Sequence, residues 1–279
     1  MVWAVATLGL NMPDAIWIGL ASRLEAIIDS FDVQNICNSL WGIAALGNVM
    51  VGESEAQDLG EVEATIQTHL RLLCVKAKSV VAAIDDTDHN FMTLSHVSML
   101  SWGIAVLKIR DKDMVQTVCK ALTEKLPFMS GADLRQVHGF LISCRLEADL
   151  GELCGAEVLA KVEGVDGGRC HKEFQSRSTT HVTMSNMQKE VATLLRSFGL
   201  EVQAEYVDAE TGYSIDCLVT SPKWKVSSFP EGVPRLCAIE VDGERKPNSI
   251  RMLNGVNYRL SQTSSRGPMP VPLCKAAWA

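Results

Sequence analysis

The chain has 279 residues, 47% hydrophobic and 21% charged, which is the balance of a folded globular protein long enough for two domains and not that of a disordered segment. Its net charge of −7 excludes a protein that coats nucleic acid through overall positive charge. The nine cysteines include no Cys-x-x-Cys pair, so neither a zinc knuckle nor a disulfide framework is indicated, and we expect buried thiols in a reducing compartment. No apolar stretch reaches the length of a membrane span, so we expect no membrane partner.

The charge is distributed unevenly along the chain. Residues 1–184 carry 15 Lys and Arg against 23 Asp and Glu, whereas residues 185–279 carry 11 against 10. The C-terminal part is therefore the better candidate for binding an anion, and the acidic first part could bind a basic protein partner.

A short motif recurs through the first half of the chain. Its copies read VWAVATLG at 2–9, LWGIAALG at 40–47 and SWGIAVLK at 101–108, with a weaker copy, VHGFLISC at 137–144, in which His138 takes the Trp position. These positions are 38, 61 and 36 residues apart, so the long middle interval predicts an insertion near 47–61. The first copy has no helix cap before it, and we expect the chain to be incomplete at its N-terminus and to lack its targeting peptide.

Each repeat is predicted to consist of two helices. Apolar residues follow helical spacing through the motif copies and through three further segments, at 15–31, 64–84 and 111–129. Helix pairs of this length bury their apolar stripes only by stacking on their neighbours. Residues 1–150 are thus predicted to form an α-helical solenoid of αα repeats, with about four units of roughly 38 residues. We expect the repeated Trp residues, and His138, to pack in its core; stacking of the Trp rings on RNA bases is the alternative.

The helical periodicity is lost between 151 and 184, where Gly, Ser and Thr become frequent. This composition predicts a linker. Cys170, His171 and His181 fall here at a spacing that fits no metal-ligand pattern, so we expect them in a solvated loop.

A second domain is predicted over 185–279. Ser185 and Gln188 form a capping box that begins a helix ending at Gly199. Strands follow at 201–207, 213–219 and 236–243, and the first two are joined by a turn at 208–212. Strict alternation on the second strand would place Ile215 and Cys217 on one face and Asp216 on the other.

Three carboxylates are candidate catalytic residues. Glu240 and Asp242 lie on one side of the third predicted strand, and Asp216 lies on its neighbour. Like charges held together call for a metal or a hydrogen-bond network, so one interpretation is a Mg²⁺ site at Asp216 and Glu240 that activates water for phosphodiester cleavage. The alternative is a network at the strand ends that holds the fold.

Four basic residues follow the third predicted strand. They form a cluster of positive charge in the C-terminal part of the chain, and we predict that they contact RNA phosphates. The alternative interpretation is a solvated helix face. The four residues are Arg245, Lys246, Arg251 and Arg259.

The residues just described resemble a RAP domain. The similarity consists of Ser185, Gln188, Glu190 and Val191, then GYSID at 212–216, IEVDG at 239–243, LNG at 253–255 and Trp278, and it covers nearly all of 185–279. The resemblance implies a small α/β restriction-endonuclease-like fold that binds RNA. The motif helices resemble the octotricopeptide repeats and the helical repeats of FAST kinase-like proteins, which are linked to organellar RNA.

The resemblance implies an RNA-binding protein that acts on single-stranded or ribosomal RNA. Its expected role is in the processing, stability or translation of mitochondrial or chloroplast transcripts. Asp242 stands where nucleases of this fold usually have a Lys, so binding without cleavage is the first hypothesis. A Mg²⁺-dependent endoribonuclease and an acidic protein-interaction scaffold are the alternatives.

Overall fold

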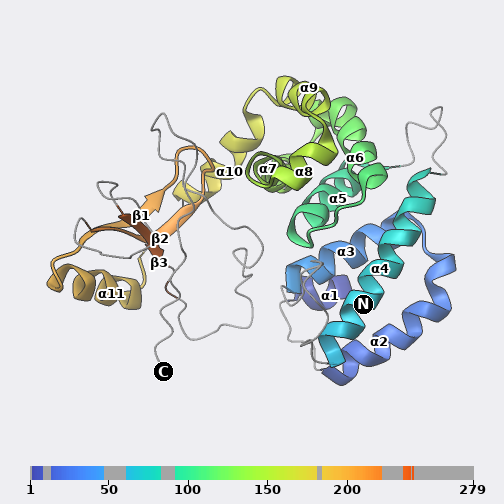
Figure 1. Cartoon of the computed structure of the whole chain (residues 1–279), viewed down its shortest axis with the longest axis horizontal. Helices are drawn as coiled ribbons and strands as arrows, with labels where there is room; N and C mark the ends of the chain where they lie inside the picture. Colours follow the sequence, from blue (N-terminus) through green and yellow to red (C-terminus); the bar gives the residue numbers. More distant parts are fainter. Residues whose placement is uncertain are drawn as a thin grey trace. The chain divides into compact units, whose positions relative to one another are not determined.

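The part of the chain that the structure describes is mostly helical, with one small antiparallel sheet of three strands (Figure 1). The computed structural model describes residues 2–8, 14–46, 61–82, 92–180, 184–221, 235–239 and 241. These residues form two compact units that divide after Cys170, which we call the helical unit (up to Cys170) and the sheet unit (from His171). Among the described helices, none has the length and hydrophobicity needed to cross a membrane.

The helical unit consists of short and medium-length helices. Polar side chains begin several of them: Asp32, Thr93, Asp111 and Ser130 each accept a hydrogen bond from a backbone amide in the first turn. The elements are α1 (Val2–Thr7), α2 (Asp14–Ile27), η1 (Ile28–Ser30), α3 (Val33–Leu46), α4 (Glu61–Ala82), α5 (Leu94–Val106), α6 (Lys112–Lys125), η2 (Leu126–Phe128), α7 (Gly131–Leu146), α8 (Ala148–Cys154), α9 (Ala156–Asp166) and the start of α10 (Arg169–Thr180).

The four motif copies lie on four helices that pack one after another. They fall on α1, α3, α5 and α7, and α1 packs on α3, α3 on α5 and α5 on α7. Figure 1 shows α3 between α1 and α5. A second series of contacts joins α2 to α4, α4 to α6, and α6 to α8 and α9. The helices predicted between the motif copies are thus present. The predicted insertion lies outside the described residues, except that Glu61 begins α4.

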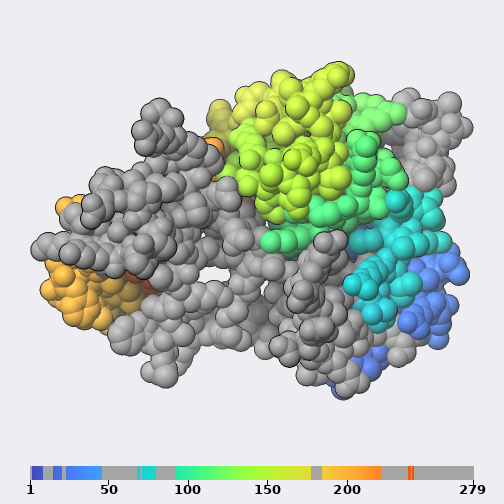
Figure 2. All heavy atoms as spheres, viewed as in Figure 1, coloured from blue at the N-terminus to red at the C-terminus, as the bar shows by residue number. Residues whose placement is uncertain are grey.

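The glycine of the motif permits close approach of neighbouring helices. A Cβ atom at Gly42 would lie only 2.8 Å from the backbone nitrogen of Trp3, so α1 reaches α3 where α3 has no side chain. At Gly103, the equivalent position on α5, a Cβ atom would lie 3.6 Å from the Cβ atom of Leu40. The space-filling view shows α5 to α9, in green to yellow-green, as one closely packed body (Figure 2).

The prediction of a linker over 151–184 is wrong for the local structure, because α8, α9 and α10 occupy most of it. Its glycines separate short helices: Gly155, Gly167 and Gly168 all have positive φ. Asp166 then begins α10, since its carboxylate accepts a hydrogen bond of 2.9 Å from the backbone nitrogen of Cys170. The predicted solvated loop is also wrong at Cys170, which is buried; His171 is half-buried on α10, and His181 lies outside the described residues.

After the end of α10, the described part of the sheet unit contains a further helix and three strands in the predicted order. They are α11 (Asn186–Ser197), β1 (Glu201–Val207), β2 (Ser214–Ser221) and β3 (Arg235–Ile239). β2 is the central strand and both of its pairings are antiparallel, with Cys217 opposite Ala204 on one side and Ile239 on the other. The predicted capping box is confirmed, because Ser185 and Gln188 exchange both hydrogen bonds at the start of α11.

A tight turn joins β1 to β2 at the predicted position. The buried Asp208 carboxylate accepts hydrogen bonds from the backbone nitrogen of Thr211 at 2.8 Å and from its hydroxyl at 2.7 Å. Gly212 has φ +75°, a conformation that favours glycine. The turn packs against α10, where Phe174 and Tyr213 make an edge-on ring contact with centroids 4.7 Å apart.

In the hairpin of β1 and β2, the side chains do not alternate regularly between the two faces of the sheet. Val202 packs in the cluster that contains Cys217, whereas Tyr206 packs in a second cluster with Ile215. Regular alternation would place Val202 and Tyr206 on the same face. Glu205 lies between them with φ +52°, in the left-handed region. The prediction that Ile215 and Cys217 share a face is therefore wrong, because the pleat is not regular at this point.

Candidate functional site

One of the predicted site residues can be placed in detail. Asp216 lies in β2, half-buried. The remaining ones lie outside the described residues: Glu240, Asp242, Arg245, Lys246, Arg251 and Arg259. The described part of β3 runs from Arg235 to Ile239, directly before Glu240.

Each carboxylate oxygen of Asp216 accepts a hydrogen bond. Oδ1 accepts from the side-chain nitrogen of Gln188 at 2.6 Å, and Oδ2 accepts from the backbone nitrogen of Val241 at 2.7 Å. The first donor belongs to α11 and the second to the chain that follows β3. Asp216 thus connects the central strand to the helix on one side and to the end of β3 on the other. Hydrogen bonds to a carboxylate are among the stronger ones in proteins.

Gln188 performs two functions at the start of α11. Its carbonyl oxygen accepts a hydrogen bond of 2.5 Å from the backbone nitrogen of Ser185, which completes the capping box. Its amide nitrogen donates to Asp216. The orientation of the Gln188 amide is consistent with both bonds, since one atom accepts and the other donates. The helix start and the carboxylate therefore hold one another in position.

A second carboxylate, which the sequence analysis missed, lies opposite Asp216. The hairpin pairs Ala204 with Cys217 and Tyr206 with Ile215, so Glu205 and Asp216 occupy facing positions. Burial raises the pKa of Glu205, and the negative charge of Asp216 raises it further. The sequence did not reveal this pair, because counting outward equally from the predicted turn at 208–212 places Glu205 opposite Ile215, one residue away from the observed register.

The carboxylate oxygens of this site have lone pairs that could bind a ligand. Each oxygen of Asp216 has a second lone pair that could accept from a ligand or coordinate a cation, and Glu205 supplies a neighbouring carboxylate. Among the residues that the structure describes, no three His, Cys, Asp or Glu side chains are arranged to hold a metal ion. The contacts that are described are those of a hydrogen-bond network at the strand ends.

The motif helices present a second candidate surface. The rings of Trp41 and Trp102 lie with centroids 5.9 Å apart and planes inclined by 40°, and both are half-buried. Trp102 packs against the core as expected, and His138 is buried in the equivalent position. Trp3 is 44% exposed, so the expectation of core packing is wrong for this residue.

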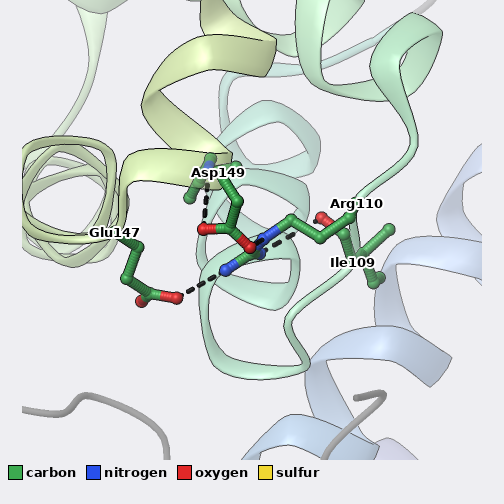
Figure 3. Close-up of polar contacts among 5 residues, drawn as sticks. Ile109, Arg110, Glu147 and Asp149 are labelled. Atoms are coloured by element: carbon green, nitrogen blue, oxygen red, sulfur yellow. Dashed lines mark hydrogen bonds and ion pairs between the residues drawn. The ribbon is translucent and has the colours of Figure 1, made fainter. Parts of the chain in front are cut away.

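Several basic side chains of the helical unit form ion pairs with acidic side chains. Arg110, which follows α5, donates to Asp149 at 2.6 Å and to Glu147 at 2.5 Å, where α7 meets α8 (Figure 3). Lys78 on α4 lies 2.8 Å from Asp111, the residue that caps α6. Such pairs join neighbouring helices and leave less positive charge for an anionic ligand.

Comparisons with known proteins add no identification. No family model, no curated protein and no solved structure matches the chain.

Proposed function

We propose that this protein binds RNA in mitochondria or chloroplasts and acts in the processing, stability or translation of their transcripts or ribosomal RNA. The observation that carries the proposal is the position of all four motif copies on α1, α3, α5 and α7, helices that pack in sequence. Such an arrangement supports an α-helical solenoid of αα repeats. Repeats of this kind offer an extended surface on which a single-stranded RNA can be bound unit by unit.

The motif helices supply suitable contact groups. Trp41 and Trp102 are half-buried neighbours, and aromatic rings of this kind can stack on bases without regard to sequence. Three residues before Trp41, Trp102 and His138, about one helical turn, lies a half-buried side chain that differs from unit to unit. These side chains are Asn38, Met99 and Arg135. We propose that these side chains contact the bases.

The sheet unit is proposed to be a RAP-like α/β domain that contacts the RNA backbone. The order of α11, β1, β2 and β3 agrees with the order predicted from the sequence patterns, and a small α/β unit of this kind is compatible with the proposal. Its phosphate contacts are proposed to be Arg245, Lys246, Arg251 and Arg259.

Binding without cleavage is the favoured form of the proposal. Both oxygens of Asp216 already accept hydrogen bonds from the protein, which supports a role in holding the sheet unit together. The endonuclease alternative would use Asp216 and Glu240 to hold Mg²⁺ and would require the ion to share these lone pairs.

The test is equilibrium binding of a fluorescent single-stranded RNA to the intact chain across a salt series, with and without Mg²⁺. We expect an affinity that falls as salt rises, since phosphate contacts release counterions. Changing Arg245, Lys246, Arg251 and Arg259 to Gln should weaken binding and reduce the salt dependence. A matched variant with the same loss of charge changes four exposed lysines of other segments, and it should bind nearly as the wild type does: Lys112, Lys120, Lys161 and Lys172.

The other outcomes separate the alternatives. Cleavage that requires Mg²⁺ and is lost in Asp216→Ala, with binding retained, would establish the endoribonuclease. Absence of binding at low salt would exclude RNA as the ligand of this chain and favour the acidic scaffold, whose partner would be a basic protein.

A further inference from the structure

Three buried cysteines from three helices meet in the helical unit. Cys119 lies on α6, Cys144 on α7 and Cys154 at the end of α8, and their exposed fractions are 0%, 4% and 0%. The Sγ atom of Cys154 lies 3.3 Å from that of Cys144 and 3.5 Å from that of Cys119. All three are free thiols. Cys154 is therefore in contact with two alternative partners.

The contacts make the three thiols chemically unequal. The hydrogen bonds of Cys119 and Cys144 lower the pKa of Cys154, burial opposes this effect, and the positive charge of Arg110 makes the smallest contribution, which also lowers it. The same hydrogen bonds, together with burial, raise the pKa of Cys119 and that of Cys144. The Cys154 sulfur contacts both of the other sulfurs, so Cys154 is the common partner of either disulfide.

We propose that this cluster is an oxidation site in which Cys154 forms a disulfide with either Cys144 or Cys119 when the protein meets hydrogen peroxide. The thiolate of Cys154 attacks one peroxide oxygen, the O–O bond breaks, and the departing hydroxide takes up a proton as water. The resulting sulfenic acid is attacked by the sulfur of Cys144 or Cys119, which loses its proton, and a second water leaves. One peroxide is reduced and two thiols are oxidised.

The geometry supports either product. A disulfide needs sulfurs about 2.05 Å apart. From separations of 3.3 and 3.5 Å, side-chain rotation has to close little more than about 1.3 Å. Because the sulfurs are almost fully buried, a small neutral oxidant is favoured over a protein disulfide. The product would tie α8 to α7 or to α6. This inference does not depend on RNA binding.

Cys37 provides a matched control within the same unit. It is 1% exposed, and its Sγ atom lies 3.7 Å from the backbone oxygen of His96. Burial raises the pKa of Cys37 to about 12. Cys37 shares the burial of the cluster but not its contact between thiols, so it should stay reduced under the same treatment.

The test treats the intact, folded chain with hydrogen peroxide, quenches it with a thiol-alkylating reagent and maps the disulfides by mass spectrometry. We expect peptides that join Cys154 to Cys144 and to Cys119. Cys119→Ala should divert the product to the pair with Cys144, and Cys144→Ala should divert it to the pair with Cys119. Cys154→Ala should abolish both, whereas Cys37→Ala should change neither.

Two outcomes would overturn the proposal. One is a Cys154 that stays reduced at peroxide concentrations that leave the circular dichroism of the chain native. The other is a Cys119–Cys144 disulfide that forms as readily in Cys154→Ala as in the wild type. Because each alanine variant is compared under native conditions, a variant that unfolds is recognised by its lost helical signal. In that case Cys154→Ser, the closer replacement in size, takes its place in the same comparison.

Discussion

In the helical unit, one continuous cluster of buried apolar side chains runs from Trp17 on α2 to Cys170 on α10. In the described part of the sheet unit, the buried apolar side chains fall into two small clusters of four and three residues. There, the bonds of Asp216 join the central strand to α11 and to the end of β3. The difference teaches that a large unit can rely mainly on apolar burial, while a small one depends more on a few polar contacts.

The largest effect expected from this comparison is at the core of the helical unit. Phe140 on α7 is fully buried, and its replacement by alanine should lower the free energy of unfolding by about 3–5 kcal/mol, since it leaves a cavity. Phe128, 75% exposed in η2, is the matched control, and Phe128→Ala should cost less than about 0.5 kcal/mol. Urea unfolding followed by circular dichroism measures both. Equal effects of the two changes would contradict the continuous core.

A smaller effect is expected at Asp216. Asp216→Ala removes the acceptor of the Val241 amide and of the Gln188 side chain, and should lower the stability of the sheet unit by about 1–3 kcal/mol. Hydrogen exchange of peptides from α11 and β2 reports that unit separately from the helical one. Glu201→Ala, on an exposed position of β1, is the control and should leave the exchange unchanged. Unchanged exchange in Asp216→Ala would show that the bonds of this carboxylate do not hold the unit.

The smallest effect is expected at the ion pairs of the helical unit. The hydrogen bond with Arg110 lowers the pKa of Asp149. The ionised Asp149 therefore makes its full contribution to stability above the ordinary pKa of an aspartate. This contribution is lost as the pH falls through the lowered value. Since Asp149 is mostly exposed, solvent screening limits the loss in Asp149→Asn to about 0.3–1 kcal/mol at neutral pH.

Glu147, which also pairs with Arg110, tests the direction of this pH dependence. Burial raises the pKa of Glu147 despite the charge of Arg110, so protonation of Glu147 favours the folded state as the pH falls from neutral. The stability difference between wild type and Asp149→Asn should therefore shrink toward low pH. For Glu147→Gln, the stability of the wild type relative to the variant should instead increase as the pH falls. Urea unfolding at a series of pH values measures both trends, and trends of the same sign would contradict the assignment.

Much of the helical unit could be predicted because its pattern repeats within the chain. Four copies of the motif identify α1, α3, α5 and α7 without any knowledge of their contacts. The helices of 151–180 were missed because they are short and their glycines resemble those of a loop. The meeting of three thiols could not be predicted, since nothing in the spacing of the cysteines says which helices pack together.

The candidate site was predictable in part for a similar reason. Asp216 and the capping box at Ser185 follow from local patterns, and both are present in the structure. The bond between Gln188 and Asp216 joins residues far apart in the sequence and depends on how α11 packs on the sheet. The left-handed conformation of Glu205, and the shift of side-chain faces with it, breaks the alternation rule from which strand faces are predicted.

The motif glycine has a consequence for how such a protein can change its length. Gly42 receives the backbone of the preceding motif helix, and Gly103 repeats the arrangement one unit later against Leu40. At both of these junctions a motif glycine faces the preceding motif helix, tightly at Gly42 and in ordinary van der Waals contact at Gly103. Units built in this way are interchangeable at their borders, so a duplicated or deleted unit would meet a junction that already fits. Gene duplication and protein engineering could therefore lengthen or shorten this array in whole units without a new interface.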